Sequence, residues 1–145
     1  MISNRKLLTL LNHEPTSAQK EQLLYLHDIS EIVRAPAEAA NIWLSIPPEQ
    51  PSIVELLQPV VQWISENSQE NDWLWVQGDG GAVFVIVQYA LKNQLIPVYA
   101  TTKRESIEYV ENGKTFKKSV FSHIQFRRYE EYTSSDFSIA EPSAF

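Results

Sequence analysis

The hydrophobic pattern of this chain changes its spacing once, near residue 106. Before that point, short apolar runs alternate with longer stretches whose apolar residues recur at helical spacing, which predicts strands separated by helices. The predicted strands are 6–11, 31–34, 72–77 and 95–100, and the predicted helices are 16–26, 36–44, 53–64 and 82–91. This alternation is typical of a mainly parallel sheet with helices on both faces.

Local signals set the expected ends of these helices. Thr16 or Ser17 is the expected N-cap of the first helix, and Ser52 that of the third. Pro59 predicts a kink or a break near Gln58. The expected inner side of the first helix is formed by Leu23, Leu24 and Leu26.

After Ser106 the apolar residues alternate with polar ones on both sides of Asn112-Gly113. This dipeptide between alternating runs predicts an antiparallel β-hairpin. We therefore expect one α/β domain over residues 1–129 that ends in a hairpin. Residues 130–145 are rich in acids, Ser and Pro, and are expected to form a poorly ordered tail.

The amino-acid composition limits the kinds of site that the chain is expected to contain. The chain of 145 residues contains no cysteine and three histidines, so no thiolate or histidine-rich metal site is expected, and no cofactor. No secretory leader or run of about 20 apolar residues is found, so we expect a cytoplasmic protein that does not enter a membrane.

The net charge of −6 is unevenly distributed. Residues 101–128 hold seven basic residues against three acids, while residues 1–100 hold five against eleven. A local basic block favours a compact anionic ligand over a DNA duplex, which needs a broad basic face. Alternatively, lysines on a hairpin discourage edge-to-edge pairing, an interpretation that fits Lys114, Lys117 and Lys118.

Three of the four glycines lie between residues 78 and 81, where a buried strand meets an apolar helix. Backbone N–H groups at such a helix start can bind an anion. The glycines can equally serve close packing of the strand and helix. Both interpretations stay open at this point.

Polar residues follow three of the predicted parallel strands. They are Asn12-His13, Gln77–Gly81 and Thr101–Arg104, which we expect as loops that converge on one phosphate group. The spacing of Gly78, Gly80 and Gly81 fits neither a dinucleotide fingerprint nor a Walker loop. Asp79 stands where an α/β-hydrolase elbow would need serine.

The same segments resemble a known family. Asn12-His13 with Thr16 and Gln19, Trp75–Ala82, Leu95–Arg104 and His123–Tyr129 are together similar to the Csx-twenty proteins that accompany type III CRISPR systems. The resemblance spans residues 5–129, but is loose between 28 and 70. It implies a Rossmann-like fold related to the cyclic-oligoadenylate-sensing (CARF) domains. It also implies a ring nuclease that opens cyclic oligoadenylate, with cyclic tetra-adenylate the expected ring, and so ends an antiviral signal.

For such an enzyme we expect a metal-independent attack by a ribose 2′-OH, in a homodimer with the ring across its two-fold axis. His13 is the expected general acid or base, and Lys103 and Arg104 the expected catalytic cations on the phosphate. The expected ligand-binding residues are Asn12, Gln77, Gly78, Asp79, Gly80, Gly81, Thr101, Thr102 and Arg127.

Simpler roles remain for several of these residues. His13 can cap the following helix, and Asp79 is favoured as the cap of its own helix. Only one of Arg127 and Arg128 can face a ligand, because adjacent strand residues point to opposite faces. The expected surface or hairpin residues are His27 and His123, and the tryptophans 43, 63, 73 and 75 are expected in the core. The alternative functions are a binding or sensing module that does not cut the ring, and an assembly protein that uses its hairpin edge.

Overall fold

The centre of the structure, a computed structural model that describes residues 4–138, is a five-stranded sheet of order β2-β1-β3-β4-β5. β1 pairs in parallel with β2 and β3, β3 pairs in parallel with β4, and β5 pairs antiparallel with β4. The strands are β1 (Lys6–Leu10), β2 (Glu31–Arg34), β3 (Trp73–Val76), β4 (Ile96–Glu111) and β5 (Lys114–Arg128). The predicted class, a mainly parallel Rossmann-like α/β sheet with a C-terminal antiparallel hairpin, is confirmed.

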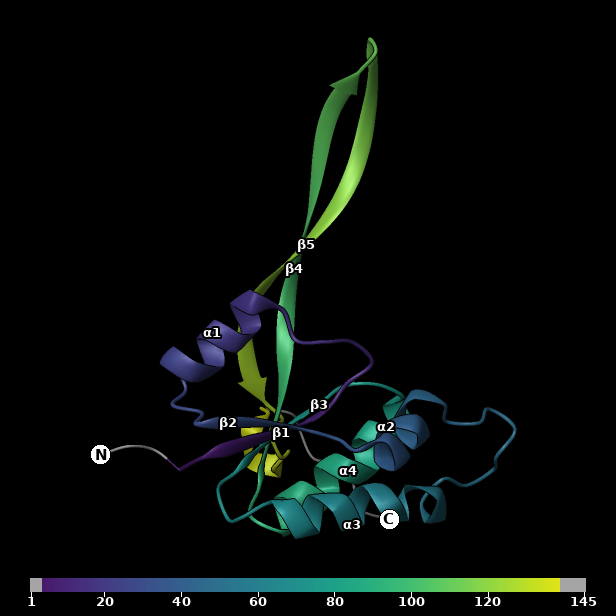
Figure 1. The fold of residues 1–145 in the computed structure, drawn as a ribbon, viewed down its shortest axis with the longest axis vertical. Coiled ribbons are helices and arrows are strands. Elements are labelled where there is room, and N and C mark those ends of the chain that lie inside the picture. The colour runs from purple at the N-terminus through teal and green to yellow at the C-terminus, as the bar shows by residue number, and fades with distance from the viewer. Residues whose placement is uncertain (1–3, 139–145) are drawn as a thin grey trace.

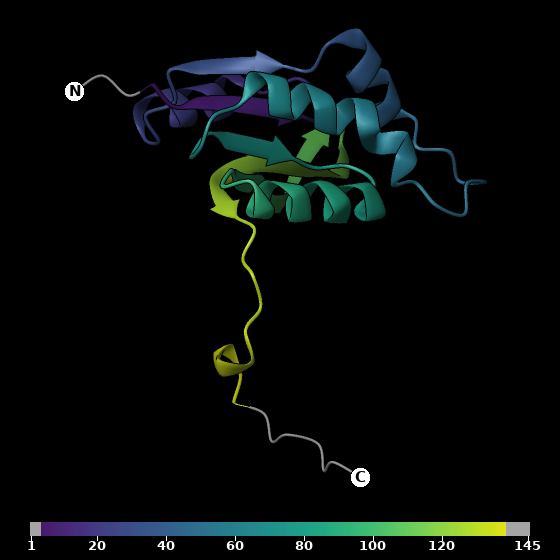
Figure 2. The same cartoon turned by 90° about the horizontal axis from the view of Figure 1, so that it is seen from below.

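Helices cover both faces of the sheet, as the alternation predicts (Figures 1 and 2). They are α1 (Ser17–Tyr25), α2 (Ala37–Leu44), α3 (Gln58–Asn67) and α4 (Gly80–Lys92). Because successive strand residues point to opposite faces, Leu7 of β1 joins the core under α1, whereas Leu8 joins the core under the other three helices. All four tryptophans are buried, as expected.

α1 begins at a capping box, in which the Thr16 hydroxyl accepts from the Gln19 N–H and the Gln19 side chain accepts from the Thr16 N–H. The expected cap is therefore confirmed. The expected inner side is correct only for Leu23, because Leu24 and Leu26 are exposed. Leu24 points about 100° away from Leu23 around the helix axis, and Leu26 follows the last helical residue.

The stretch predicted as one helix over 53–64 is divided. A 3₁₀ turn, η1 (Glu55–Leu57), precedes α3, and Pro59 lies in the first turn of α3. A proline is tolerated there because the first N–H groups of a helix have no acceptor within it. The break near Gln58 is confirmed, and the helix start at Ser52 was wrong.

α4 covers the predicted helix 82–91 and extends it at both ends. It buries only one side, formed by Ala82, Ile86 and Ala90, while Phe84 on another side is exposed. α4 therefore carries more apolar side chains than the sheet covers.

β4 differs most from expectation. Residues 101–104, predicted as a loop, continue the strand, because β5 pairs with β4 from Val98 as far as the turn at Asn112-Gly113. Both turn residues have positive φ, 51° and 75°, as a two-residue hairpin turn requires. Ile124 is an extra residue in β5, since Thr101 pairs with Gln125 and Thr102 with His123. The outer part of this hairpin, residues 102–124, projects beyond α1, and we call it the arm (Figure 1).

The chain after β5 leads away from the body of the protein (Figure 2). Its start is fixed by Tyr129, whose hydroxyl donates to the carbonyl of Val76 at 2.6 Å. A 3₁₀ turn, η2 (Ser134–Asp136), is the only regular element of the described residues beyond β5. The rest of the predicted tail, 139–145, lies outside the described residues.

Candidate functional site

A cavity of about 410 Å³ lies at the carboxyl ends of β1 and β2, where they meet α2. Asn12 and His13 line it from the segment between β1 and α1, Arg34 from the end of β2, and Trp43 from α2. Its position agrees with the rule that ligands of parallel α/β sheets bind beyond the carboxyl ends of the strands. Its volume is at the lower end of the range for small-molecule sites, which suits one nucleotide unit better than a whole cyclic oligonucleotide.

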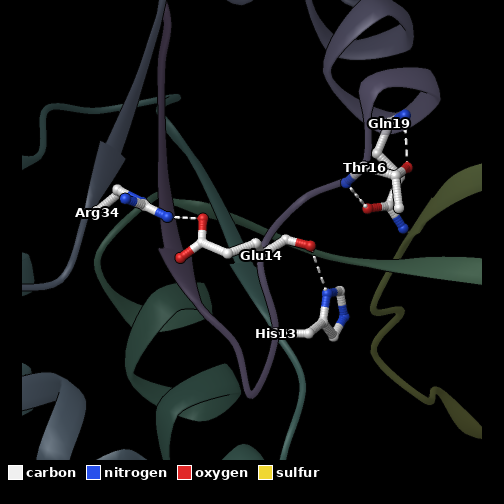
Figure 3. Close-up of polar contacts among 5 residues, drawn as sticks. All are labelled: His13, Glu14, Thr16, Gln19 and Arg34. Carbon is white, nitrogen blue, oxygen red and sulfur yellow. Dashed lines mark hydrogen bonds and ion pairs between the residues drawn. The ribbon is translucent and has the colours of Figure 1, made fainter.

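His13 is exposed, and one of its ring nitrogens has a defined partner (Figure 3). Nδ1 lies 3.0 Å from the backbone carbonyl oxygen of Glu14. Because a carbonyl oxygen only accepts, Nδ1 is the donor in this contact, and the tautomer with its proton on Nδ1 has its lone pair on Nε2. His13 lines the cavity, and its ring points to the side away from Arg34 (Figure 3). It does not cap α1, since Thr16 fills that role.

Arg34 forms an ion pair with Glu14 (Figure 3), and both residues line the cavity. Both side chains are exposed, at 62% and 73%, so the pair orients the guanidinium more than it stabilises the fold. The guanidinium has five N–H donors, of which a carboxylate occupies two at most. The sequence reasoning missed Arg34. Part of the signal was available, because Arg34 ends a predicted strand, but only the structure shows that this strand lies beside the one that leads to His13.

The glycine turn serves close packing. A Cβ on Gly78 would lie 2.8 Å from Nε1 of Trp43, so only glycine fits against this indole. The Asp79 carboxylate accepts from the N–H of Ala82 at 3.0 Å, which confirms it as the cap of α4. Gly80 and Gly81 begin the helix, where N–H groups have no acceptor within the helix. Trp43 stands between this turn and the cavity.

Gln77 joins three parts of the carboxyl edge. Its side-chain oxygen accepts from Nε1 of Trp75 at 2.7 Å and from the N–H of Ala100 at 2.9 Å. Its backbone oxygen accepts from Nε1 of Trp43 at 3.0 Å. The ring of Trp75 in turn lies 6.1 Å from that of His13, edge to face. The segments at 12–13 and 77–78 are thus neighbours, as expected, although Gln77 is used for structure.

The β4 residues predicted to bind phosphate point outward along the arm. Beyond Ala100 each residue adds about 3.3 Å, so Arg104 lies roughly 13 Å past the level of Gln77. Lys103 pairs with Glu105 at 3.5 Å, and Arg104 donates to the hydroxyl of Ser119. Neither cation lines the cavity. The structure brings Asn12 and His13 together with Gln77 and leaves these two cations at the root of the arm.

The remaining predicted residues have contacts of their own. The hydroxyl of Thr101 lies 3.2 Å from the carbonyl oxygen of Gln125, to which it donates. Arg127 stacks on the ring of Tyr99 at 5.1 Å, and Arg128 pairs with Val98 on the opposite face. Thr102 is exposed beside these groups.

The two histidines expected as surface or hairpin residues are both half-buried, and His123 lies on the hairpin, in β5. His27 packs on Trp73 at 4.8 Å and His123 packs on Phe126 at 5.0 Å, both beneath α1. Nε2 of His123 contacts the side-chain oxygen of Gln22 at 2.8 Å. Burial lowers the pKa of His123. Burial also lowers the pKa of His27, and the positive charge of Arg5 lowers it further. Alternation alone could not reveal this, because it depends on where α1 lies.

Within residues 4–138, no group of three or more His, Asp or Glu side chains is arranged to hold a metal ion. Across the same part of the chain, none of the helices has the length and apolar character needed to cross a membrane.

Comparison with known proteins gives the family. Residues 5–127 match the model of the uncharacterized protein MJ1673 family. The chain belongs to this family. It is also 32% identical over 127 residues to the uncharacterized protein MJ1673 of Methanocaldococcus jannaschii, a match that covers 88% of this chain and 98% of the relative. No solved structure matches the chain. The residues shared with the MJ1673 family include the whole arm, so the arm belongs to the matched region and is not an added segment.

Proposed function

We propose that the protein is a ring nuclease that opens cyclic oligoadenylate without a metal ion. The observation that carries this proposal is the cavity at the carboxyl ends of β1 and β2, which is lined by both His13 and Arg34. The sequence resemblance described above supports the choice of substrate. A homodimer with the ring across its axis would supply two such cavities to one ligand.

Each residue of the cavity has a role in the proposed reaction. His13 takes the proton of a ribose 2′-OH, and the 2′-oxygen then bonds to the adjacent phosphorus. The bond from phosphorus to the 5′-oxygen breaks, and this oxygen takes up a proton, leaving a 2′,3′-cyclic phosphate and a 5′-OH. Arg34 stabilises the charge that develops on the phosphate oxygens, for which a guanidinium fork is well shaped.

Lys103 and Arg104, the cations at the root of the arm, have a binding role in the proposed reaction. A cyclic oligonucleotide carries a phosphate at every unit, spread around the ring. Lys103 and Arg104 would contact phosphates other than the one that is cut. Their removal should therefore raise KM more than it lowers kcat, whereas loss of His13 should lower kcat.

The test is a single-turnover assay with labelled cyclic tetra-adenylate and protein in excess. We expect linear product with or without EDTA, a loss of at least about 100-fold for His13→Ala, and a comparable loss for Arg34→Ala. Lys20→Ala on α1 removes an exposed positive charge away from the cavity and is the matched control. Unchanged rates for both cavity variants would refute the assignment.

Binding without cleavage is the second candidate. It is favoured by one observation: among the described residues that line the cavity, Glu14 is the only titratable one besides His13 and Arg34, and it forms the ion pair. Ligand retention on a native gel without product over hours would identify a binding or sensing module.

A further inference from the structure

α4 carries an apolar groove on the side that faces away from the sheet. The groove has a volume of about 680 Å³ and extends along the helix from Gly80 to Lys92. Phe84 is 64% exposed, because it lies about 200° around the helix axis from the buried Ile86. The apolar side chains of α4 that line the groove are Val83, Phe84, Val87 and Leu91. Such a row of uncovered apolar side chains is typical of a surface that another protein segment covers.

The second wall of the groove is the chain that follows β5. Residues 129–132 line the groove beside α4, and the chain then leads away from the body (Figure 2). The base of this wall is fixed by the hydrogen bond from Tyr129 to Val76. Phe84 on one wall and Tyr132 on the other are both exposed, at 64% and 69%, so the groove is an uncovered corner between α4 and this segment.

The end of this segment, residues 132–137, forms a compact turn that we call the knob. The rings of Tyr132 and Phe137 lie 5.2 Å apart, and the two residues are 69% and 56% exposed. The knob is held by its own hydrogen bonds. The N–H of Thr133 donates to the carboxylate of Asp136 at 2.9 Å, and the N–H of Asp136 donates to the carbonyl of Thr133 at 3.0 Å. Its shape is therefore set before a partner covers it, which lowers the cost of binding.

We propose that the knob of each chain fills the α4 groove of a second copy, so that two chains exchange knobs about a two-fold axis. The knob lies at the far end of the segment that walls the groove, and it stands clear of its own α4 (Figure 2). A two-fold axis reverses the direction of the second chain, so the knob of that chain points back toward this α4. Phe84, Tyr132 and Phe137 of both copies are then covered together.

The area to be covered agrees with a dimer of moderate strength. An aromatic side chain buries about 150–250 Å² when it is fully covered, so at 69% and 56% exposure one knob offers on the order of 250 Å². With an equal area of groove and two knobs, the dimer would bury about 1,000 Å², which is the lower limit for a specific interface. A single knob would bury half of this area. The exchange therefore has to be mutual, and we expect a reversible dimer at micromolar concentration.

The charges around the groove favour a protein segment over a nucleic acid or a free phosphate. Glu130 and Glu131 border the groove, and Lys92 is the only charged residue of α4. An anion would meet two carboxylates for one cation, and it would leave the apolar wall uncovered. The knob brings one carboxylate, Asp136, and two aromatic rings.

Sedimentation velocity over a range from low micromolar to near-millimolar concentration tests the exchange. The wild type should dimerise reversibly. Phe84→Ser in the groove and Phe137→Ser in the knob should each shift the midpoint to at least about tenfold higher concentration. Phe121→Ser is the matched control, because Phe121 is 63% exposed and lies on the arm, outside the groove. A wild type that stays monomeric throughout, or an equal effect of Phe121→Ser, would overturn the proposal.

Cysteine variants decide whose knob fills the groove, since the chain contains no cysteine of its own. Gln88→Cys places a thiol in the groove, and Ser138→Cys places one directly after the knob. When these two single variants are mixed and mildly oxidised, we expect a disulfide-linked dimer that contains one copy of each. Lys20→Cys on α1, used in place of Ser138→Cys, is the control for chance collision and should cross-link much more slowly.

Two outcomes of the cysteine experiment would contradict the exchange. One is a mixture that cross-links no faster than the Lys20→Cys control. The other is a double variant, Gln88→Cys with Ser138→Cys, that closes its disulfide only within one chain, because the knob would then occupy its own groove. Circular dichroism of each variant checks that the fold is intact. This proposal does not depend on the nuclease, so either can fail alone.

Discussion

Replacing Gly78 by alanine should destabilise the protein through a single contact. The added Cβ would lie 2.8 Å from Nε1 and 3.1 Å from Cε2 of Trp43. Carbon atoms in good contact are about 3.5–4.0 Å apart, so the indole must shift by roughly 0.7–1 Å. This shift lengthens the hydrogen bond from Nε1 of Trp43 to the carbonyl of Gln77, now 3.0 Å, beyond useful range.

The two losses add. Overpacking of this kind costs about 1–3 kcal/mol and a lost internal hydrogen bond about 1 kcal/mol, so we expect a loss of about 2–4 kcal/mol. For a chain of this length that corresponds to a fall in Tm of roughly 6–15 °C. Urea unfolding followed by tryptophan fluorescence measures the free energy directly, because Trp43 is itself a reporter.

Gly80→Ala is the matched control. No atom lies within 4 Å of a Cβ built at Gly80, and its φ is not positive, so alanine should be neutral or stabilising by up to about 1 kcal/mol. If Gly78→Ala unfolds within about 0.5 kcal/mol of the wild type, the turn is not constrained by Trp43. The reasoning that the glycine is needed for packing would then be wrong.

Three further perturbations have defined outcomes. Thr16→Ala removes the capping box of α1 and should cost about 1 kcal/mol by urea unfolding, whereas Ser17→Ala, after the cap, should cost much less. Asp79→Asn keeps a cap on α4, so the free energy of unfolding should change little. The variant also removes a negative charge, so cyclic tetra-adenylate should bind more tightly in a titration, and a weaker affinity would contradict this. Because burial lowers the pKa of His27 and His123 in the folded protein, the unfolded chain binds protons more readily as the pH falls below about 6.5. Stability should therefore decline from pH 7 toward pH 5, less so in the double variant His27→Gln with His123→Gln, and an equal decline in both proteins would exclude these two groups as the cause.

Much of the fold could be predicted because its signals are local. The cap at Thr16, the break near Gln58 and the turn at Asn112-Gly113 each depend on a few adjacent residues. The parallel sheet follows from alternation of strands and helices. The length of the arm did not follow, since the extension of β4 past residue 100 depends on pairing with β5, and its exposed residues give no burial pattern.

The candidate site was harder to predict, because its members come from separate elements. His13 was found from its place after a strand, while Arg34 needed the knowledge that β2 lies beside β1. Gly78 was flagged correctly as special, but only the position of Trp43 explains why. Whether Lys103 and Arg104 contact a ligand stays a prediction.

The continuity of β4 has a mechanical consequence. This one strand runs from the interior of the sheet, at Val98, to the tip of the arm, and Gln77 holds it at Ala100 where it leaves the body. Near that point Gln22 of α1 donates to the carbonyl of Ile124 and so braces the other strand. Both strands of the arm are therefore held at their base by hydrogen bonds to the body, at the carboxyl edge that also carries His13.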